Sequence, residues 1–289
     1  MKEKNISDEK SRRRDKINIL VTIDANYIGP LKVMLKSLAL NNPDELFHIW
    51  LLHSSVPGKD LAALSEYSAA QGMSWTAIKV GRELFESAPI TKQYPREMYY
   101  RLLAPFLLPA FLDRILYLDP DMLVLNSVRP LWEMALKDNT FAAASHSIIF
   151  EIVHKVNRAR LGTTGSENDY FNTGVLLMDL SKARKLISTD DVFSYVRKKA
   201  EQLLLPDQDV FNGLYGSHTL PINDVIWNYD ARYYSVYLFQ SNGKCDMDWI
   251  MRHTVFLHFC GKKKPWKKKY SVRFAALYKH YMNLIKSER

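Results

Sequence analysis

The chain has 289 residues, of which 47% are hydrophobic and 25% charged, a composition that fits a globular protein and excludes low-complexity or largely disordered classes. Its net charge of +9 comes from the two ends of the chain. Residues 261–289 hold ten Lys and Arg and one acid, and residues 1–16 hold seven Lys and Arg and four acids, whereas residues 17–260 carry a net charge of −3. An acidic body argues against a nucleic-acid groove across the fold, so no nucleic-acid partner is expected.

The cysteines and the apolar runs indicate in which cellular compartment the protein is expected. Cys245 and Cys260 are the only cysteines, too few for a disulfide framework, which favours a reducing compartment. Residues 1–16 lack the apolar core of a signal peptide, and the most apolar run, residues 102–112, is too short to cross a bilayer. The sequence predicts a cytoplasmic protein and leaves peripheral attachment to the inner face of the membrane open.

The first part of the chain alternates strands and helices. Residues 17–23 form a continuous apolar run rich in β-branched side chains, which predicts a buried strand. A helix follows with Ile28, Leu31, Leu35 and Leu38 on one face, and it ends near residues 41–43. Strands over residues 47–52 and 73–80 flank a helix over 61–70. Such alternation is typical of a βαβ sheet.

The later elements are less regular. Residues 99–112 begin as a helix that prolines then interrupt. Further strands are predicted over residues 114–118, 141–144, 174–178 and 254–259, with an extended segment over 122–125. Further helices are predicted over residues 191–204 and 272–285, and another opens at Pro206. Polar residues follow several of these strands, at the sheet edge where open α/β folds bind ligands.

Two aspartates follow the strand over residues 114–118. Asp119 and Asp121 flank Pro120, and a turn there lets both carboxylates face one cation. Mn²⁺ and Mg²⁺ prefer such oxygen ligands and also take phosphate oxygens of a substrate. A solvated turn is the alternative interpretation of the same residues.

Six segments in order together resemble glycosyltransferase family 8, a family of retaining enzymes that includes bacterial lipooligosaccharide galactosyltransferases and the glycogenins. The segments are residues 19–27, 99–102, 114–121, 170–180, 206–212 and 258–266. The resemblance implies an α/β GT-A fold, with a Rossmann-like mixed sheet flanked by helices. We expect a disordered basic arm over residues 1–16, one catalytic domain over 17–266 and a basic amphipathic helix over 267–289.

The resemblance also implies roles for individual side chains. Asp119, Asp121 and His258 would bind Mn²⁺ or Mg²⁺, and Asp207 and Gln208 would lie beside the anomeric carbon. The implied contacts to the nucleotide sugar come from Thr22, Asp24, Asn26, Tyr27, Arg101, Asp119, Asn172, Thr173, Gly261 and Lys264.

Several of these residues also have a purely structural interpretation. Asp24 and Asn26 suit helix capping, Asp207 suits the acidic start of a helix, and His258 suits a satisfied core histidine.

One segment departs from the family pattern. Some members have an aspartate after the strand that corresponds to residues 141–144, where this chain continues with Ser145, His146 and Ser147. His146 or Ser147 would substitute for it, which leaves open whether the donor hexose is glucose or galactose. Residues 150–168 lie where the family varies its acceptor loops.

The function implied is retaining transfer of a hexose from a UDP-hexose donor to an acceptor hydroxyl, in lipopolysaccharide or another cell-surface glycan. A same-face internal return and a covalent route both remain open. Two alternatives are a metal-dependent nucleotidyltransferase and a non-catalytic protein that binds anionic surfaces.

The C-terminal segment combines a basic charge with an apolar stripe at helical spacing. The stripe consists of Tyr270, Phe274, Leu277, Tyr278, Tyr281, Leu284 and Ile285. A basic amphipathic helix can lie in the interface of an anionic membrane, where a lipid-linked acceptor would be reached. Alternatively, the same face packs on the catalytic domain.

Overall fold

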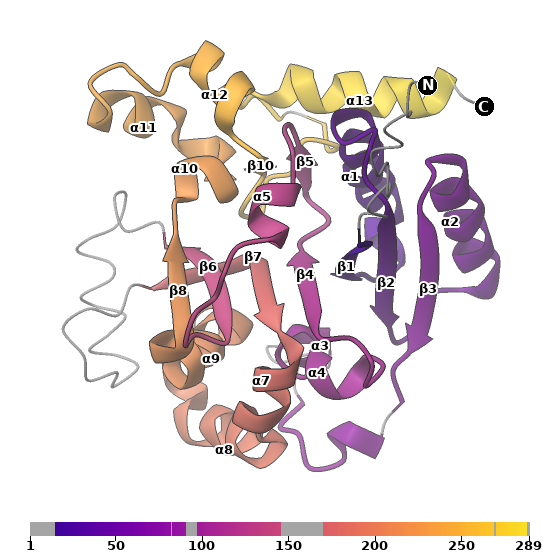
Figure 1. Ribbon diagram of the computed structural model, residues 1–289, viewed down its shortest axis with the longest axis vertical. Coiled ribbons are helices and arrows are strands. Elements are labelled where there is room, and N and C mark those ends of the chain that lie inside the picture. The colour runs from indigo at the N-terminus through magenta and orange to yellow at the C-terminus, as the bar shows by residue number, and fades with distance from the viewer. Residues whose placement is uncertain (1–14, 82, 91–96, 146–169, 269, 288–289) are drawn as a thin grey trace, which may run out of the picture.

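The computed structural model describes residues 15–81, 83–90, 97–145, 170–268 and 270–287 (Figure 1). Its centre is a seven-stranded sheet of order β3-β2-β1-β4-β7-β6-β8. The strands are β1 (Ile17–Thr22), β2 (Phe47–His53), β3 (Ser74–Lys79), β4 (Arg114–Leu118), β6 (Phe141–Ser145), β7 (Phe171–Asp179) and β8 (Thr219–Ile222). The pairs among β1 to β4 are parallel, whereas β7 runs antiparallel to β4 and β6. The predicted mixed sheet is confirmed.

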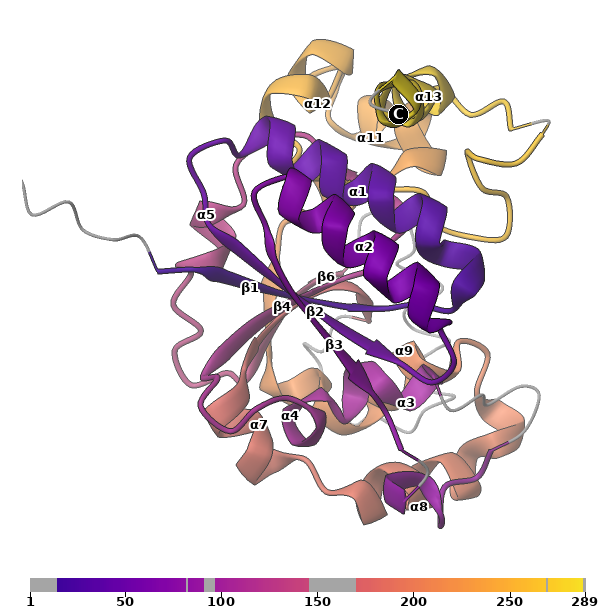
Figure 2. The same cartoon turned by 90° about the vertical axis from the view of Figure 1, so that its right-hand side faces the viewer.

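Helices cover both faces of this sheet (Figure 2). One face packs on α1 (Ile28–Asn41) and α2 (Gly58–Ala70), and the other on α3 (Glu97–Leu102), α4 (Ala104–Leu107), α7 (Leu180–Leu186), α8 (Thr189–Lys199) and α9 (Pro206–Tyr215). In β1, Ile19 and Val21 face the first layer and Leu20 faces the second. Successive side chains of a strand alternate between faces, so a continuous apolar run serves two cores.

A second sheet of three short strands lies beside the first. Its order is β5-β10-β9, formed by β5 (Met122–Val124), β10 (Phe256–His258) and β9 (Tyr229–Asp230). Around it lie α5 (Arg129–Trp132), α10 (Asp224–Trp227), α11 (Tyr234–Gln240) and α12 (Met247–His253). The chain passes from the large sheet to the small one through the turn at Asp119 and Asp121, so the segment after β4 starts a new sheet.

Short 3-10 turns complete the described elements. They are η1 (Ala25–Tyr27), η2 (Glu83–Phe85), η3 (Ala200–Gln202), η4 (Gly216–His218) and η5 (Ala231–Tyr233). The helix expected over residues 191–204 is therefore split, because α8 ends at Lys199 and η3 follows it.

The C-terminal helix α13 (Ala275–Ser287) lies along α1 (Figures 1 and 2). Phe274 and Tyr278 are almost fully buried, and the Tyr281 hydroxyl accepts a hydrogen bond of 2.9 Å from Asn41 Nδ2. Leu277, Leu284 and Ile285 pack against the same cluster. Of the two interpretations of this apolar face, packing on the catalytic domain is the one that the structure shows, because α1 and the small sheet cover it.

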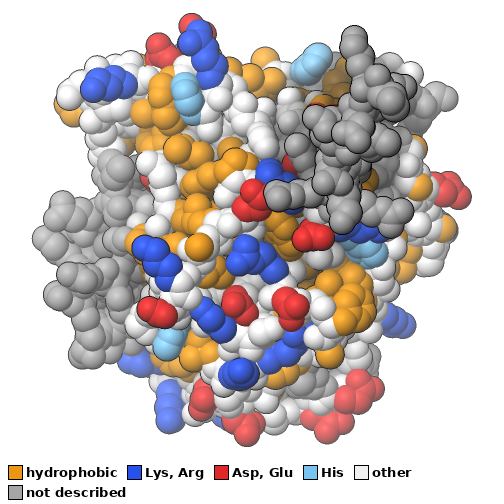
Figure 3. All heavy atoms as spheres, in the orientation of Figure 1, with side chains coloured by type: hydrophobic (Ala, Val, Ile, Leu, Met, Phe, Trp, Pro, Cys, Tyr) orange, Lys and Arg blue, Asp and Glu red, His pale blue; other side chains and the backbone are white. Residues whose placement is uncertain are grey.

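No helix within the described ranges is both long and apolar enough to cross a membrane. On the face shown in Figure 3, acidic and basic side chains are interspersed. Several predictions fall outside the described residues: residues 1–14 of the basic arm expected over 1–16, the substitution by His146 and Ser147, and the acceptor loop over residues 150–168.

Candidate active site

A cleft of about 820 Å³ opens where the segments after β1, β4 and β10 meet the start of β7 and of α9. Thirteen of the fourteen site residues predicted from the sequence line it. They are Thr22, Asp24, Tyr27, Arg101, Asp119, Asp121, Asn172, Thr173, Asp207, Gln208, His258, Gly261 and Lys264. Segments far apart in the sequence therefore converge on one cavity of the size that binds a small ligand.

Asn26 is the exception, and it supports Asp24 instead. Its backbone N–H and its Nδ2 donate to the two oxygens of the Asp24 carboxylate, at 2.8 and 3.1 Å. Asp24 thus caps η1 while lining the cleft, so the capping and the ligand-facing interpretations both describe it. The exposed Asn26 holds that carboxylate in place.

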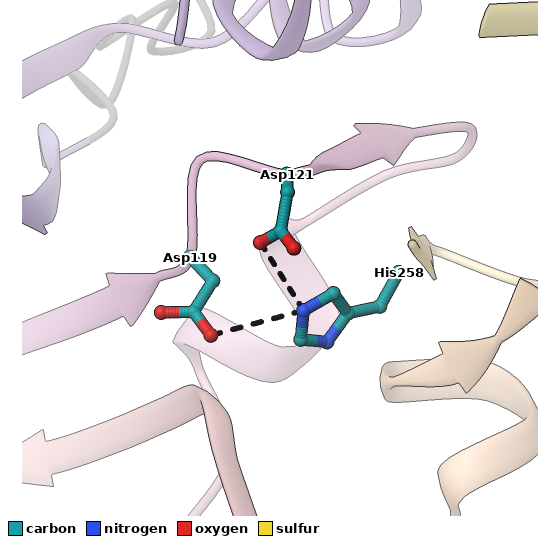
Figure 4. A group of neighbouring side chains, drawn as sticks. All are labelled: Asp119, Asp121 and His258. Carbon is teal, nitrogen blue, oxygen red and sulfur yellow. Dashed lines mark ion pairs between the residues drawn. The ribbon is translucent and has the colours of Figure 1, made fainter. Parts of the chain in front are cut away.

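Three side chains form a compact group of metal-ligand type (Figure 4). The Nε2 atom of His258 lies 3.3 Å from Asp121 Oδ1 and 3.7 Å from Asp119 Oδ2. The aspartates come from the turn between β4 and β5, and His258 ends the facing strand β10. Two carboxylates and an imidazole around a common centre make a donor set suited to a divalent cation.

Gly174 leaves the space that this group occupies. A Cβ atom there would lie 2.3 Å from His258 Cε1 and 2.9 Å from Asp119 Oδ2. Its carbonyl accepts the Asp119 N–H at 2.8 Å, so β7 approaches the turn directly. The glycine is required for close approach and not for an unusual backbone conformation, since its φ lies outside the left-handed region.

The orientation of His258 follows from a chain of amides. Asn172 Oδ1 accepts the Gly174 N–H at 2.9 Å, so the Asn228 atom bonded to this oxygen, also at 2.9 Å, is the donor Nδ2. The other amide atom of Asn228 is therefore its oxygen, and it accepts from His258 Nδ1 at 2.9 Å. Nδ1 carries a proton, and Nε2 is the ring atom that faces the carboxylates.

Charges in the group balance one another. Burial alone would raise the pKa of Asp121, but His258 and Lys264 outweigh that effect and hold it below its usual value. Burial likewise opposes protonation of His258, yet its interactions with Cys260 and Asp121 raise its pKa well above the usual value. Lys264 Nζ pairs with Asp121 and donates to the Phe259 carbonyl at 3.0 Å. A cation binding here competes with the His258 proton.

Arg101 links the parts of the cleft. Its Nη2 donates to Asp119 Oδ1 at 2.9 Å, and its Nη1 contacts Thr173 Oγ1 at 3.0 Å and Asp207 Oδ2 at 3.1 Å. The Tyr117 hydroxyl also donates to Asp119 Oδ1, at 2.7 Å, and the guanidinium stacks on the Tyr117 ring at 4.5 Å. With Oδ1 held twice, Asp119 turns its Oδ2 toward His258.

Two buried polar residues fix α9. Asp209 accepts the backbone N–H groups of Leu204 and Leu205, at 2.6 and 3.0 Å, and the Tyr170 hydroxyl. Asn212 bonds both main-chain groups of Phe171, at 2.6 and 2.8 Å. These contacts hold the start of α9, which carries Asp207 and Gln208, against the start of β7.

Sequence reasoning missed Asn228 and Arg232. Asn228 is fully buried and orients His258, while Arg232 lines the cleft from η5. Neither belongs to a motif, and an isolated asparagine or arginine beside a two-residue strand carries no pattern by which to find it.

Comparisons with known proteins agree with this geometry. The model of glycosyl transferase family 8 matches residues 18–270. The lipopolysaccharide 1,2-glucosyltransferase of Escherichia coli K12 is 26% identical over 87% of this chain and 73% of that protein. General stress protein A of Bacillus subtilis is 25% identical over 95% of this chain and 96% of that protein. The lipopolysaccharide 1,3-galactosyltransferase of Salmonella typhimurium is 25% identical over 87% and 73%.

The fold has a solved counterpart. The galactosyltransferase LgtC, crystallised with donor and acceptor sugar analogues, superposes with a TM-score of 0.74 at 25% identity, over 93% of this chain and 96% of that one. The expected GT-A fold is thereby confirmed. With a family match over most of its length and a cleft built from the segments predicted, the chain belongs to glycosyl transferase family 8 and is a glycosyltransferase.

Proposed function

We propose that the protein moves glucose or galactose, with retention of configuration, from a UDP-sugar to an acceptor hydroxyl in a cell-surface glycan such as lipopolysaccharide. The observation that carries this proposal is the group of Asp119, Asp121 and His258, with Lys264 beside it, in a cleft of about 820 Å³. The lipopolysaccharide glucosyl- and galactosyltransferases among the relatives support the acceptor class and the two candidate hexoses.

The donor set fits a divalent cation. Gly174 has no side chain, and the space that a methyl group would take there is occupied by His258 and Asp119. An imidazole in the set favours Mn²⁺ over Mg²⁺, which prefers oxygen ligands only. When bound, the cation supplies positive charge that stabilises the departing diphosphate. Lys264 adds a second positive charge on the same side of the cleft, and Asn228 keeps His258 Nε2 directed at the site.

The other cleft residues suit the remaining parts of the donor. Thr22 ends β1, Asp24 and Tyr27 follow it, and all three are assigned to the nucleotide. The oxygen of Asn172 is used within the protein, so its amide nitrogen is the group assigned to the sugar.

Two residues of α9 are assigned to the reacting end of the sugar. Asp207 is held by Arg101 and is assigned to the sugar hydroxyls, while the uncharged Gln208 is assigned to the reacting face.

Donor hydrolysis without an acceptor tests the proposal. Purified protein is incubated with UDP-glucose or UDP-galactose and Mn²⁺, and the product is identified. UDP is the expected product, whereas pyrophosphate would indicate nucleotidyl transfer. Asp121→Ala is expected to lower turnover by about 10²-fold or more. Asp248→Ala, which removes a carboxylate 82% exposed on α12, is the matched control. Undiminished activity of Asp121→Ala in chelator would contradict the proposal.

Contact with an anionic membrane stays a prediction, but only electrostatic attraction is now expected to contribute to it. Since α13 uses its apolar face for packing, attraction would come from exposed lysines at Lys262, Lys263, Lys267, Lys268, Lys279 and Lys286. Sedimentation with anionic and neutral vesicles tests it, using lysine-to-glutamine variants because truncation would open the core. Binding that ignores vesicle charge or salt would refute it.

A further inference from the structure

A third positive side chain lines the cleft, and it has no role in the assignments above. Arg232 follows β9 in η5 and lies beside Cys260 and Gly261. Its Nε donates to both oxygens of Asp230, at 2.9 and 3.1 Å, and its Nη2 donates to Asp230 Oδ2 at 2.6 Å. Asp230 is only 2% exposed. One edge of the guanidinium is therefore fixed to a buried carboxylate.

The other edge is presented to the cleft. Among the described residues no acceptor bonds Nη1 of Arg232, and the side chain remains 40% exposed. Gly261 makes room for this edge, because a Cβ at that position would lie 2.7 Å from Nη1. The φ of Gly261, +85°, also favours glycine there. Stacking of the guanidinium over the Tyr233 ring, at 5.0 Å, further limits its movement.

Arg232 differs in this respect from the other cations of the cleft. Arg101 and Lys264 bond to Asp119, Asp207 and Asp121, which themselves line the cavity. The partner of Arg232 is not part of the lining and lies behind the guanidinium. A ligand at Arg232 would therefore meet the two N–H donors of Nη1, with the Asp230 carboxylate bonded to the opposite edge of the guanidinium.

We propose that Arg232 binds a phosphate group of a substrate through Nη1. A guanidinium held along one edge is well suited to phosphate oxygens, since its remaining donors are already oriented. The inference rests on the proposed function, and it leaves two sources for the phosphate: the diphosphate of the donor or a phosphate carried by the acceptor.

The first experiment addresses the donor. UDP binding in the presence of Mn²⁺ is measured by calorimetry for wild type, Arg232→Gln and the control Arg252→Gln, which removes a guanidinium 74% exposed on α12. If the donor supplies the phosphate, Arg232→Gln binds UDP about tenfold or more weakly, the effect of losing one charge-assisted hydrogen bond. Arg252→Gln should bind UDP like wild type.

The second experiment addresses the acceptor. Inorganic phosphate is titrated into each protein with Mn²⁺, both with and without saturating UDP. If the acceptor supplies the phosphate, UDP affinity is unchanged in Arg232→Gln, while phosphate binding to the UDP-loaded protein weakens about tenfold or more. If neither UDP nor phosphate binding depends on Arg232, the inference is overturned. A wild type that binds phosphate through Arg232 but binds no UDP would contradict the proposed function and support this inference.

Two further variants separate binding from folding. Arg232→Gln removes the guanidinium that pairs with the buried Asp230 carboxylate, so the double variant Asp230→Asn/Arg232→Gln, which removes both charges, is measured beside it. Arg232→Lys keeps the charge but cannot span Asp230 and a ligand together, and an intermediate loss of affinity is expected. The unfolding temperature of each variant reports whether it is folded. Wild-type UDP and phosphate affinity in a folded double variant would also overturn the inference.

Discussion

Replacing Gly174 with alanine tests the metal site through a single methyl group. The new Cβ would lie 2.3 Å from Cε1 and 2.9 Å from Nδ1 of His258, and 2.9 Å from Asp119 Oδ2. Carbon atoms in contact are about 3.5–4.0 Å apart, so the ring must retreat by about 1 Å or more. Metal–ligand distances tolerate only about 0.2 Å. A displacement of this size removes His258 from the ligand set.

Gly174→Ala should lower the free energy of unfolding only moderately but the Mn²⁺ affinity strongly. Inserting one methyl group into a packed region costs about 1–3 kcal/mol of unfolding free energy, so the variant should fold. Removing a residue that supports a metal ligand typically lowers metal affinity about 10- to 100-fold. Because Gly174→Ala displaces a ligand itself, its Mn²⁺ affinity should fall by at least this much. Donor hydrolysis should fall with it.

Calorimetric titration of Mn²⁺ in the presence of UDP, beside urea unfolding, measures both quantities. Gly216→Ala is the matched control, because a Cβ there meets nothing within 4 Å. Wild-type Mn²⁺ affinity in a folded Gly174→Ala variant would refute the reasoning, since the added methyl group could not then coexist with the proposed ligand arrangement.

Three other substitutions probe separate parts of the molecule. Asn228→Ala should lower Mn²⁺ affinity about 10- to 100-fold, because His258 Nδ1 loses its acceptor; an unchanged titration would remove Asn228 from the site. Gln208→Ala should lower kcat more than it weakens donor binding, as expected for a contact made mainly in the transition state; steady-state kinetics beside donor titration decide this, and weaker binding at constant kcat would make Gln208 a binding residue only. Phe274→Ala should lower the free energy of unfolding by about 3–5 kcal/mol, because its ring packs against Tyr229 and Tyr234; urea unfolding with a loss below about 1 kcal/mol would contradict this.

The large sheet was predictable because its strands carry strong local signals. The buried runs of β1, β2 and β4 and the apolar face of α1 are visible in the sequence and occur as expected. The small sheet was not predictable as a sheet. Its strands have two or three residues, and the pairing of β10 with β5 joins segments more than a hundred residues apart. Edge strand β8 contains Pro221, which weakens its strand signal.

The cleft lining was predictable from the family resemblance, but its supporting contacts were not. Residues such as Asp119 and His258 belong to recognisable segments, whereas Asn228 acts through an amide orientation that only the folded structure defines. The apolar stripe of the C-terminal helix was located only in part, because Tyr270 and Phe274 lie before α13, and its packing partner was not identified. An apolar stripe predicts that one face of a helix is buried, but it does not identify the surface that buries it. In the structure α13 packs against α1.

The turn at Asp119 and Asp121 also joins two separately hydrogen-bonded sheets. The Asp119 N–H donates to the Gly174 carbonyl in β7 of the large sheet, whereas the Asp121 carbonyl accepts the Phe259 N–H beside β10 of the small sheet. A cation held by both aspartates and His258 would act as a cross-link between them, and its occupancy would add to the stability of both. Amide exchange in β5, β9 and β10 would then slow on loading. Depletion of the cation would loosen the segment that carries Arg232, Lys264 and α13 before the large sheet opens.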